Sequence, residues 1–216
     1  GEPLDVGTIY DSNRYTLYGM LSELGADVID MGVIRDSREE VERAFDAAAA
    51  CADVVITSGG VSVGDADFVK ETLERRGEVN FWKIAMKPGR PLAFGSLGDA
   101  IFFGLPGNPV SVMVTYYQFV QSALKAMMGE RVPPPLRLRA RSLDRMKKRS
   151  GRMEFQRGVV RRGADGELEV STTGAQGSGI LTSMHHANCF VILPTESEGV
   201  GMGELVEIEP FHGVLR

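Results

Sequence analysis

Hydrophobic positions in the first part of the chain recur three and four residues apart, as they do along one face of a helix. This spacing predicts helices at residues 12–24 and 38–50. Gly25 follows the first pattern and is placed to end that helix. Ser37 and Glu40 form a capping box at the start of the second helix, which fixes its N-terminus.

Between and after these helices the hydrophobic residues form short runs, which predict strands. Strands are predicted at residues 27–34 and 54–56, and the second run does not alternate, as expected of a strand covered on both faces. A helix is predicted at residues 68–75, and a hairpin joins residues 92–94 to 100–104. This order predicts a three-layer α/β domain with a mostly parallel sheet.

The pattern changes after Pro133, where three consecutive prolines form a stiff linker. Hydrophobic and polar residues then alternate with period two, and turn signals separate the segments. Four strands are predicted, at residues 136–141, 167–170, 190–193 and 205–209. We therefore expect two domains, an α/β domain at residues 1–132 and a small all-β sandwich or barrel at residues 133–216.

The overall composition is that of a soluble globular protein and narrows the choice of partners. A net charge of -5 and a pI near 5.3 argue against a nucleic-acid-binding chain. No hydrophobic run approaches the roughly 20 residues that span a bilayer. Cys51 and Cys189 both lie in apolar surroundings and are expected to be buried free thiols. The sequence predicts a cytoplasmic protein without nucleic-acid or membrane partners.

The stretch at residues 57–67, Thr-Ser-Gly-Gly-Val-Ser-Val-Gly-Asp-Ala-Asp, joins a predicted strand to a predicted helix. Glycines such as Gly59 and Gly60 let a backbone approach a ligand, and a helix start offers free N–H groups to an anion. Asp65 and Asp67 fit such a site if a divalent cation lies between them and a phosphate. The alternative is a plain strand-to-helix turn with an aspartate cap.

Two further segments carry candidate chemistry. Lys83 and Lys87 are four residues apart in a predicted strand at residues 79–87, so both would face one side. Residues 105–111 form a second strand–loop–helix junction with Pro109 in the first helical turn. Each has a simpler explanation, a solvated strand face for the lysines and an ordinary helix entry for the loop. Together they favour a phosphorylated ligand and a metal at the carboxyl ends of the strands.

The segments at residues 57–67, 83–91 and 104–111 occur in an order that resembles the molybdopterin molybdenumtransferase family. These enzymes insert molybdenum into molybdopterin and are related to the E domain of gephyrin. Further segments fit the same family, at residues 9–13, 34–36, 153–158 and 173–178. The resemblance thus covers nearly the whole chain.

The resemblance implies a reaction and a site. Adenylylated molybdopterin and molybdate would be the substrates, and Mg²⁺ would assist release of AMP. Asp36, Asp67, Lys83 and Lys87 look like the catalytic residues, with Asp36 and Asp67 also as metal ligands. The implied substrate-binding residues are Asn13, Gly59, Gly60, Ser62, Pro88, Pro106, Gly107, Asn108, Pro109, Ser111, Arg157 and Ser178.

The family also implies parts outside this sequence. Its members carry two further domains and a Thr-Gly-Asp-Glu motif before the matched region, and they form homodimers. On this basis we expect the chain to lack the first strand of the α/β domain and to be inactive alone. Two alternatives remain, the related molybdopterin adenylyltransferase and a gephyrin-like scaffold. The β domain and residues 83–91 favour the molybdenumtransferase over the adenylyltransferase.

Overall fold

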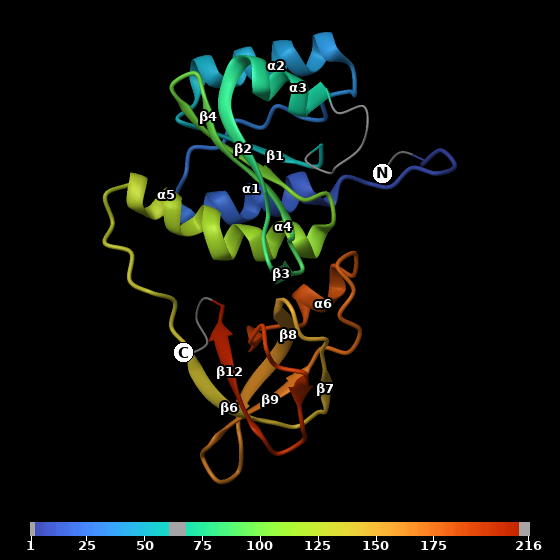
Figure 1. Cartoon of the computed structure of the whole chain (residues 1–216), viewed down its shortest axis with the longest axis vertical. Coiled ribbons are helices and arrows are strands. Elements are labelled where there is room, and N and C mark those ends of the chain that lie inside the picture. Colours follow the sequence, from blue (N-terminus) through green and yellow to red (C-terminus); the bar gives the residue numbers. More distant parts are fainter. Residues whose placement is uncertain (1–2, 61–67, 212–216) are drawn as a thin grey trace. The chain divides into compact units, whose positions relative to one another are not determined.

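The computed structural model describes residues 3–60 and 68–211, and the chain forms two compact units (Figure 1). Unit 1 comprises Gly1–Trp82 and Pro91–Tyr116, and unit 2 comprises Lys83–Arg90 and Tyr117–Arg216. Unit 2 thus includes a short segment from within the first half of the sequence. A single domain boundary near residue 132 stays a prediction.

Unit 1 is built on a four-stranded sheet. Its strand order is β1 (Val54–Ser58), β5 (Ala100–Leu105), β4 (Pro91–Leu97) and β2 (Gly77–Lys83). β1 and β5 run parallel, and β4 and β5 form the predicted antiparallel hairpin. Gly98 turns this hairpin with a positive φ of 61°, a conformation that glycine adopts without strain.

Four helices cover the sheet of unit 1, as the hydrophobic pattern predicts. α1 (Ser12–Leu24) and α4 (Pro109–Thr115) lie on one face, and α2 (Arg38–Cys51) and α3 (Phe68–Arg76) lie on the other (Figure 1). This arrangement is the three-layer α/β fold.

The predicted helix ends are confirmed. The Asp11 carboxylate accepts a hydrogen bond from the Arg14 amide at 3.2 Å, and Gly25 ends α1 with φ 88°. At α2 the Ser37 hydroxyl accepts from the Glu40 amide at 3.4 Å. Local sequence signals therefore fix where both helices begin.

The buried face of α2 forms the core of unit 1. Val41, Phe45 and Ala48 are at most 6% exposed and pack against Val55 and Phe102 of the sheet. The rings of Phe45 and Phe102 meet edge to face at 5.7 Å between centroids. Their burial is the main source of free energy that holds α2 on the sheet.

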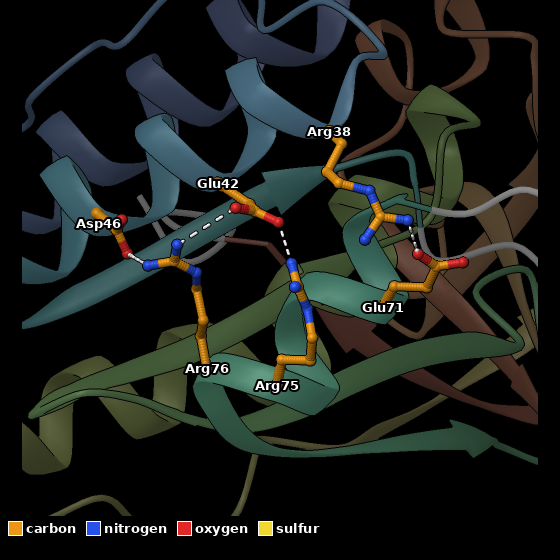
Figure 2. Close-up of polar contacts among 6 residues, drawn as sticks. All are labelled: Arg38, Glu42, Asp46, Glu71, Arg75 and Arg76. Atoms are coloured by element: carbon orange, nitrogen blue, oxygen red, sulfur yellow. Dashed lines mark hydrogen bonds and ion pairs between the residues drawn. The ribbon is translucent and has the colours of Figure 1, made fainter.

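Ion pairs join the exposed sides of α2 and α3 (Figure 2). Arg75 and Arg76 of α3 both reach Glu42 of α2, and Arg76 also reaches Asp46. Arg38 pairs with Glu71 at 2.5 Å. These contacts set the two helices side by side along one face of the sheet.

Two strand predictions are wrong. Residues 27–34 form no strand, because the described residues give this run no neighbour to pair with. The predicted strand at residues 79–87 is broken, since β2 ends at Lys83 and a separate strand, β3 (Met86–Lys87), follows. A hydrophobic run by itself therefore determines neither burial nor a ladder partner, since Ile29 is 56% and Val33 69% exposed.

Unit 2 contains a closed barrel of five strands. They are β6 (Leu138–Ser142), β8 (Met153–Arg162), β9 (Leu168–Thr172), β10 (Cys189–Leu193) and β12 (Leu205–Pro210). Their order is β10-β12-β6-β9-β8, and β8 pairs back to β10, so the sheet closes on itself. Ala140, Val170, Val191 and Ile208 are 0% exposed and fill its interior. The predicted small β domain is confirmed.

Short elements complete unit 2. β3 adds to the barrel by pairing with β8, and β7 (Met146–Lys147) pairs with β11 (Gly199–Val200). α6 (Thr182–His185) is a single helical turn. Met146 of β7 is 2% exposed and belongs to the same buried cluster as the barrel residues, and Val200 of β11 packs against that cluster.

The helical stretch that begins at Pro109 is interrupted. α4 is followed by a π-helical turn, Tyr116–Val120, and then by α5 (Gln121–Met127). No helix in the described parts of the chain is both long enough and apolar enough to cross a membrane.

Both cysteines are free thiols, but only Cys189 is buried. The expectation that Cys51 is buried is wrong, because it ends α2 on an exposed side. Burial raises the pKa of Cys189 to about 12, so this thiol stays protonated and unreactive near neutral pH.

Candidate functional site

Three segments of unit 1 meet where β1 ends. The side-chain amide of Asn13, in α1, donates to the Ser58 hydroxyl at 2.7 Å and to the Gly107 carbonyl at 2.7 Å. The Gly59 amide donates to the Leu105 carbonyl at 3.0 Å. The two predicted loops, one after β1 and one after β5, therefore lie against each other and are joined to the start of α1.

A cavity of about 630 Å³ opens beside this junction. Its polar end is lined by Asp11, Arg14, Asp36, Ser58 and Gly59, with Gly60 next to them. The structure thus brings Asp36 and the first two loop glycines, which are far apart in sequence, to one cavity.

The loop glycines are required by the local geometry. Gly59 and Gly60 have φ of 87° and 70°, a region that favours glycine. A Cβ added to Gly60 would lie 2.8 Å from a methyl group of Val69. The backbone at this end of the cavity therefore stays bare of side chains, as an anion-binding loop requires.

The polar end of the cavity carries charges of both signs. Arg14 lies 3.8 Å from Asp30 and donates to the Tyr15 hydroxyl at 2.9 Å. The hydrogen bond to Tyr15, and then the attraction of Asp30, raise the pKa of Arg14. A guanidinium beside the start of α1 suits an anionic ligand, because the helix start also favours negative charge.

Three buried polar atoms in this region have no hydrogen-bond partner among the described residues. They are Asn13 Oδ1, Arg14 Nε and Thr57 Oγ1. Buried polar groups are nearly always paired, so such atoms mark places where a polar ligand would gain hydrogen bonds.

The predicted site residues of the second loop, which follows β5, differ in how far they are exposed. Pro106 is buried, whereas Gly107 and Asn108 are exposed before Pro109 starts α4. Ser111 is only 5% exposed, and its carbonyl accepts from the Thr115 hydroxyl at 2.7 Å. Gly107 and Asn108 are therefore the residues of this loop that offer surface to a ligand.

The remaining described site residues belong to unit 2. Lys87 forms an ion pair with Glu154 at 3.1 Å, and Glu154 is 5% exposed. Lys83 ends β2, and residues 84 and 85 separate it from β3, which carries Lys87. The two lysines do not lie on one continuous strand, so the expectation that they share a strand face is wrong.

Pro88 and Arg157 are both buried in unit 2. The Arg157 guanidinium donates to the Ser183 hydroxyl at 3.1 Å and to the Gly177 carbonyl at 3.3 Å. Burial lowers the pKa of Arg157 to about 10, so the side chain is still charged at neutral pH. In the structure Arg157 holds the loop that carries Ser178, which is half-buried.

Several positioning residues were not singled out from the sequence. Ser58 links the two loops of unit 1, and Gln176 exchanges hydrogen bonds with the backbone of Arg157 at 2.7 and 3.1 Å. Both residues lie inside segments that carry the family resemblance, and only this position in the sequence indicates their importance. Glu154, the partner of Lys87, likewise lies inside such a segment.

Two predicted site residues, Ser62 and Asp67, lie outside the described residues. Within residues 3–60 and 68–211, no group of three or more His, Cys, Asp or Glu side chains is arranged to hold a metal ion. The predicted metal ligand Asp36 is exposed at the cavity.

Comparison with known proteins agrees with both units. Residues 1–126 match the family described as "Probable molybdopterin binding domain", and residues 139–211 match "MoeA C-terminal region (domain IV)". The fold and site define an α/β domain of the molybdopterin-binding class followed by a MoeA-type barrel. The chain belongs to the molybdopterin molybdenumtransferase family.

Individual relatives support this assignment. The chain is 49% identical over its whole length to a molybdopterin molybdenumtransferase of Haemophilus influenzae, and it covers 54% of that protein. It is 33% identical to gephyrin of Dictyostelium discoideum, with 93% of the chain and 32% of gephyrin aligned. The chain thus spans about half the length, or less, of these curated relatives.

Among solved structures, a molybdopterin biosynthesis moeA protein of Pyrococcus horikoshii resembles the chain with a TM-score of 0.80 and 33% identity. The match covers 99% of the chain and 51% of the archaeal protein. Both units of the fold are therefore found together in a solved relative.

Proposed function

We propose that the chain supplies the molybdopterin-binding part of an enzyme that transfers molybdenum from molybdate to adenylylated molybdopterin, with release of AMP. The observation that carries this proposal is the junction at Asn13. It joins two loops and a helix start beside a cavity that Asp36 also lines. Relatives named for this reaction support the same assignment.

In this proposal unit 1 binds the pterin and its phosphate groups. The bare backbone at Gly59 and Gly60, together with the start of α1, offers N–H groups to phosphate oxygens. Gly107 and Asn108 present the exposed surface of the second loop to the pterin.

The two lysines, Lys83 and Lys87, would bind the oxyanion substrate through their ammonium groups. Molybdate is a tetrahedral dianion, which suits ammonium groups and hydroxyls. Glu154 holds the Lys87 ammonium at 3.1 Å, while Lys87 itself remains half exposed. In our proposal Lys83, Lys87, Pro88, Arg157 and Ser178 of unit 2 take part in binding molybdate.

A Mg²⁺ ion would be held by Asp36 and Asp67. Carboxylate oxygens are the ligands that this hard cation prefers, and Asp36 is accessible from the cavity. When bound, the ion would neutralise phosphate charge during release of AMP. Asp36 would also help to orient the phosphate group, because it lines the same cavity.

We further propose that the full-length protein acts as a homodimer and that its remaining regions complete the site. The chain spans only about half of its curated relatives, so those relatives have ample further sequence to contribute.

The test is release of AMP from adenylylated molybdopterin by the full-length protein, with and without molybdate. Release should depend on molybdate and should fall at least tenfold in Asp36→Asn and Lys87→Ala. Asp99→Asn, in the exposed β4–β5 turn, is the matched control and should retain activity. Release that ignores molybdate, or that survives Asp36→Asn unchanged, would contradict the proposal. Formation of adenylylated molybdopterin from ATP would instead support the adenylyltransferase alternative.

A further inference from the structure

The ion pair between Lys87 and Glu154 lies where β3 joins the barrel of unit 2. β3 runs parallel to the start of β8, and in this register Lys87 stands opposite Glu154. The Lys87 ammonium donates a hydrogen bond to Glu154 Oε1 at 3.1 Å. Side chains that stand opposite each other on paired strands point to the same face of the sheet, so this contact follows from the strand pairing.

The backbone around Lys87 is held in place by its neighbours. The Ile84 amide donates to the Arg90 carbonyl at 2.8 Å and closes the segment that contains Lys87. Met86, directly before Lys87, is 3% exposed. A lysine side chain still turns about several bonds when its backbone is fixed. The position of the ammonium group therefore depends on the group that it contacts.

Glu154 is a rigid partner for this lysine. At this position β8 pairs with β3 on one side and with β10 on the other, where Glu154 stands opposite Leu193. Glu154 is 5% exposed and Leu193 is 0% exposed. A buried carboxylate is costly unless it is paired and hydrogen-bonded, so it has few alternative positions.

Gln156 fixes the second oxygen of this carboxylate. It lies two residues after Glu154 on the same face of β8 and is 6% exposed. Its side-chain amide donates to Glu154 Oε2 at 3.1 Å and to the Lys147 carbonyl of β7 at 3.3 Å. Both carboxylate oxygens are thus used, and Gln156 ties the Glu154 side chain to the backbone of β7.

The side chain of Lys87 is covered on one side only. It is 49% exposed, far more than that of Glu154. An ammonium group has three N–H donors, and Glu154 accepts from one of them. The other donors point away from the carboxylate and are available to a ligand.

A carboxylate beside an anion-binding lysine has two opposite effects. Its charge repels an oxyanion, but it also holds the ammonium group in one orientation before the oxyanion arrives. Water and salt around the half-exposed Lys87 screen the repulsion. The orientation persists, because Gln156 holds the buried carboxylate in place. Such preorganisation strengthens binding, since the long side chain is already ordered when the ligand binds.

We propose that Glu154 is a positioning residue for Lys87, that it orients the ammonium group toward a tetrahedral oxyanion substrate, and that Gln156 holds Glu154 in place. Neither Glu154 nor Gln156 is among the site residues that the family resemblance implies. Glu154 contacts no substrate and acts only through Lys87. This inference rests on the proposed function, because the oxyanion is the molybdate that Lys87 would bind.

The KM for molybdate, measured from AMP release by the full-length protein, tests this role. Glu154→Gln keeps the shape of the side chain but removes its charge, and should raise this KM about fivefold or more. It should change kcat, and the KM for adenylylated molybdopterin, by less than about twofold. A merely structural role would lower the amount of active protein and hence kcat, with the KM for molybdate unchanged. A KM for molybdate that stays the same or falls in Glu154→Gln would overturn the proposal.

Glu169→Gln is the matched control for this substitution. Glu169 pairs with Arg161 at 3.5 Å, near the other end of β8, so the variant also removes one ion pair from the barrel. It should leave the KM for molybdate unchanged. Gln156→Leu should raise this KM about threefold, as expected for the loss of one hydrogen bond that holds Glu154. An equal rise of KM in Glu169→Gln and Glu154→Gln would overturn the proposal.

A double-mutant cycle decides whether Glu154 acts through Lys87. Lys87→Ala should raise the KM for molybdate, and Glu154→Gln should then add less than about twofold in the Lys87→Ala background. A full, additive effect of Glu154→Gln without Lys87 would overturn this inference and leave the proposed function intact. AMP release by the parent protein that ignores molybdate would overturn the proposed function, and this inference with it.

Discussion

Asn13 joins residues that are far apart in the sequence, and its position explains why a single side chain matters at this site. Its amide nitrogen holds both Ser58, 45 residues away, and Gly107, 94 residues away. Direct contacts also join the two loops, from the Gly59 amide to the Leu105 carbonyl and from the Ser58 hydroxyl to the Pro106 carbonyl, so Asn13 adds the link that ties both loops to α1.

We predict that Asn13→Ala lowers the free energy of unfolding by about 2 kcal/mol, since two hydrogen bonds of about 1 kcal/mol each are lost. Asn13→Asp should be worse, because a carboxylate would face the Gly107 carbonyl in place of a donor. Urea unfolding measures both changes. Asn80→Ala, on the exposed side of β2, is the control. Equal stability of Asn13→Ala and the parent chain would contradict this role.

In unit 2, Arg157 is a buried cation whose donors are used by neutral acceptors. Arg157→Lys keeps the charge but loses the fork that reaches Ser183 and Gly177 together. We predict a loss of about 2–4 kcal/mol in urea unfolding of unit 2. Ser183→Ala removes one acceptor and should cost about 1 kcal/mol. An Arg157→Lys effect no larger than that of Ser183→Ala would argue against the fork.

For single residues, the sequence predicts those that act on their near neighbours in the chain. Gly25 ends α1 and Ser37 caps α2 through contacts within a few residues, and both are found as expected. The partnerships of Asn13 and Lys87 cross 45 or more residues, and nothing in the local pattern determines them. Motif segments indicate which residues are important, but not which atoms they contact.

Among the elements, β2 and β4 approach each other closely at Gly95. A Cβ at this position would lie 2.0 Å from the Glu78 carbonyl oxygen. We predict that Gly95→Ala forces the strands apart and lowers the free energy of unfolding by about 1–3 kcal/mol.

The matched control for this prediction is Gly19→Ala in α1. Gly19 has open space around its Cβ position, so alanine should stabilise the helix by about 0.5–1 kcal/mol. Thermal unfolding of both variants compares the same chemical change in two environments. Similar effects at Gly95 and Gly19 would show that the close approach is absent in solution.

The ion pairs between α2 and α3 make a pH-dependent contribution to the free energy of unfolding (Figure 2). Partial burial raises the pKa of Glu42, but hydrogen bonds and charges from Arg75 and Arg76 outweigh it, so the net pKa is lowered. A lowered folded-state pKa contributes stability above the ordinary value of 4.5, and that stability is lost as the pH falls below it.

Glu42→Gln should therefore weaken unfolding stability at pH 7 slightly and flatten its decline below pH 4.5. The difference should shrink in 1 M salt, at which the Debye length is about 3 Å. Glu39→Gln, on the exposed first turn of α2, is the control. A Glu42→Gln effect that is independent of both pH and salt would contradict an electrostatic role.

Element prediction fails where pairing decides the structure. Residues 27–34 carry the hydrophobic run of a strand, yet a strand exists only when a neighbour accepts its hydrogen bonds. The run at residues 54–56 has the same pattern and forms β1 because β5 lies beside it. The two outcomes differ in partners, which a single hydrophobic pattern does not contain.

At the scale of the whole molecule, the sequence is sufficient for the fold class. The alternation of helices and strands predicts the α/β unit, and period-two alternation predicts the β unit, and both are found. Closure of the barrel through β8 and β10 is not predictable from spacing, because it joins strands separated by another strand and a long loop. The same holds for inclusion of Lys83–Arg90 in unit 2.

The central claim is that unit 1 binds molybdopterin at the junction of its two loops. Equilibrium titration of the full-length protein with molybdopterin, followed by pterin fluorescence, measures this binding directly. We predict saturable binding that Asn13→Ala weakens at least tenfold and that Asn80→Ala leaves unchanged. Absence of binding, or equal affinity of the Asn13→Ala variant and the parent protein, would contradict the account.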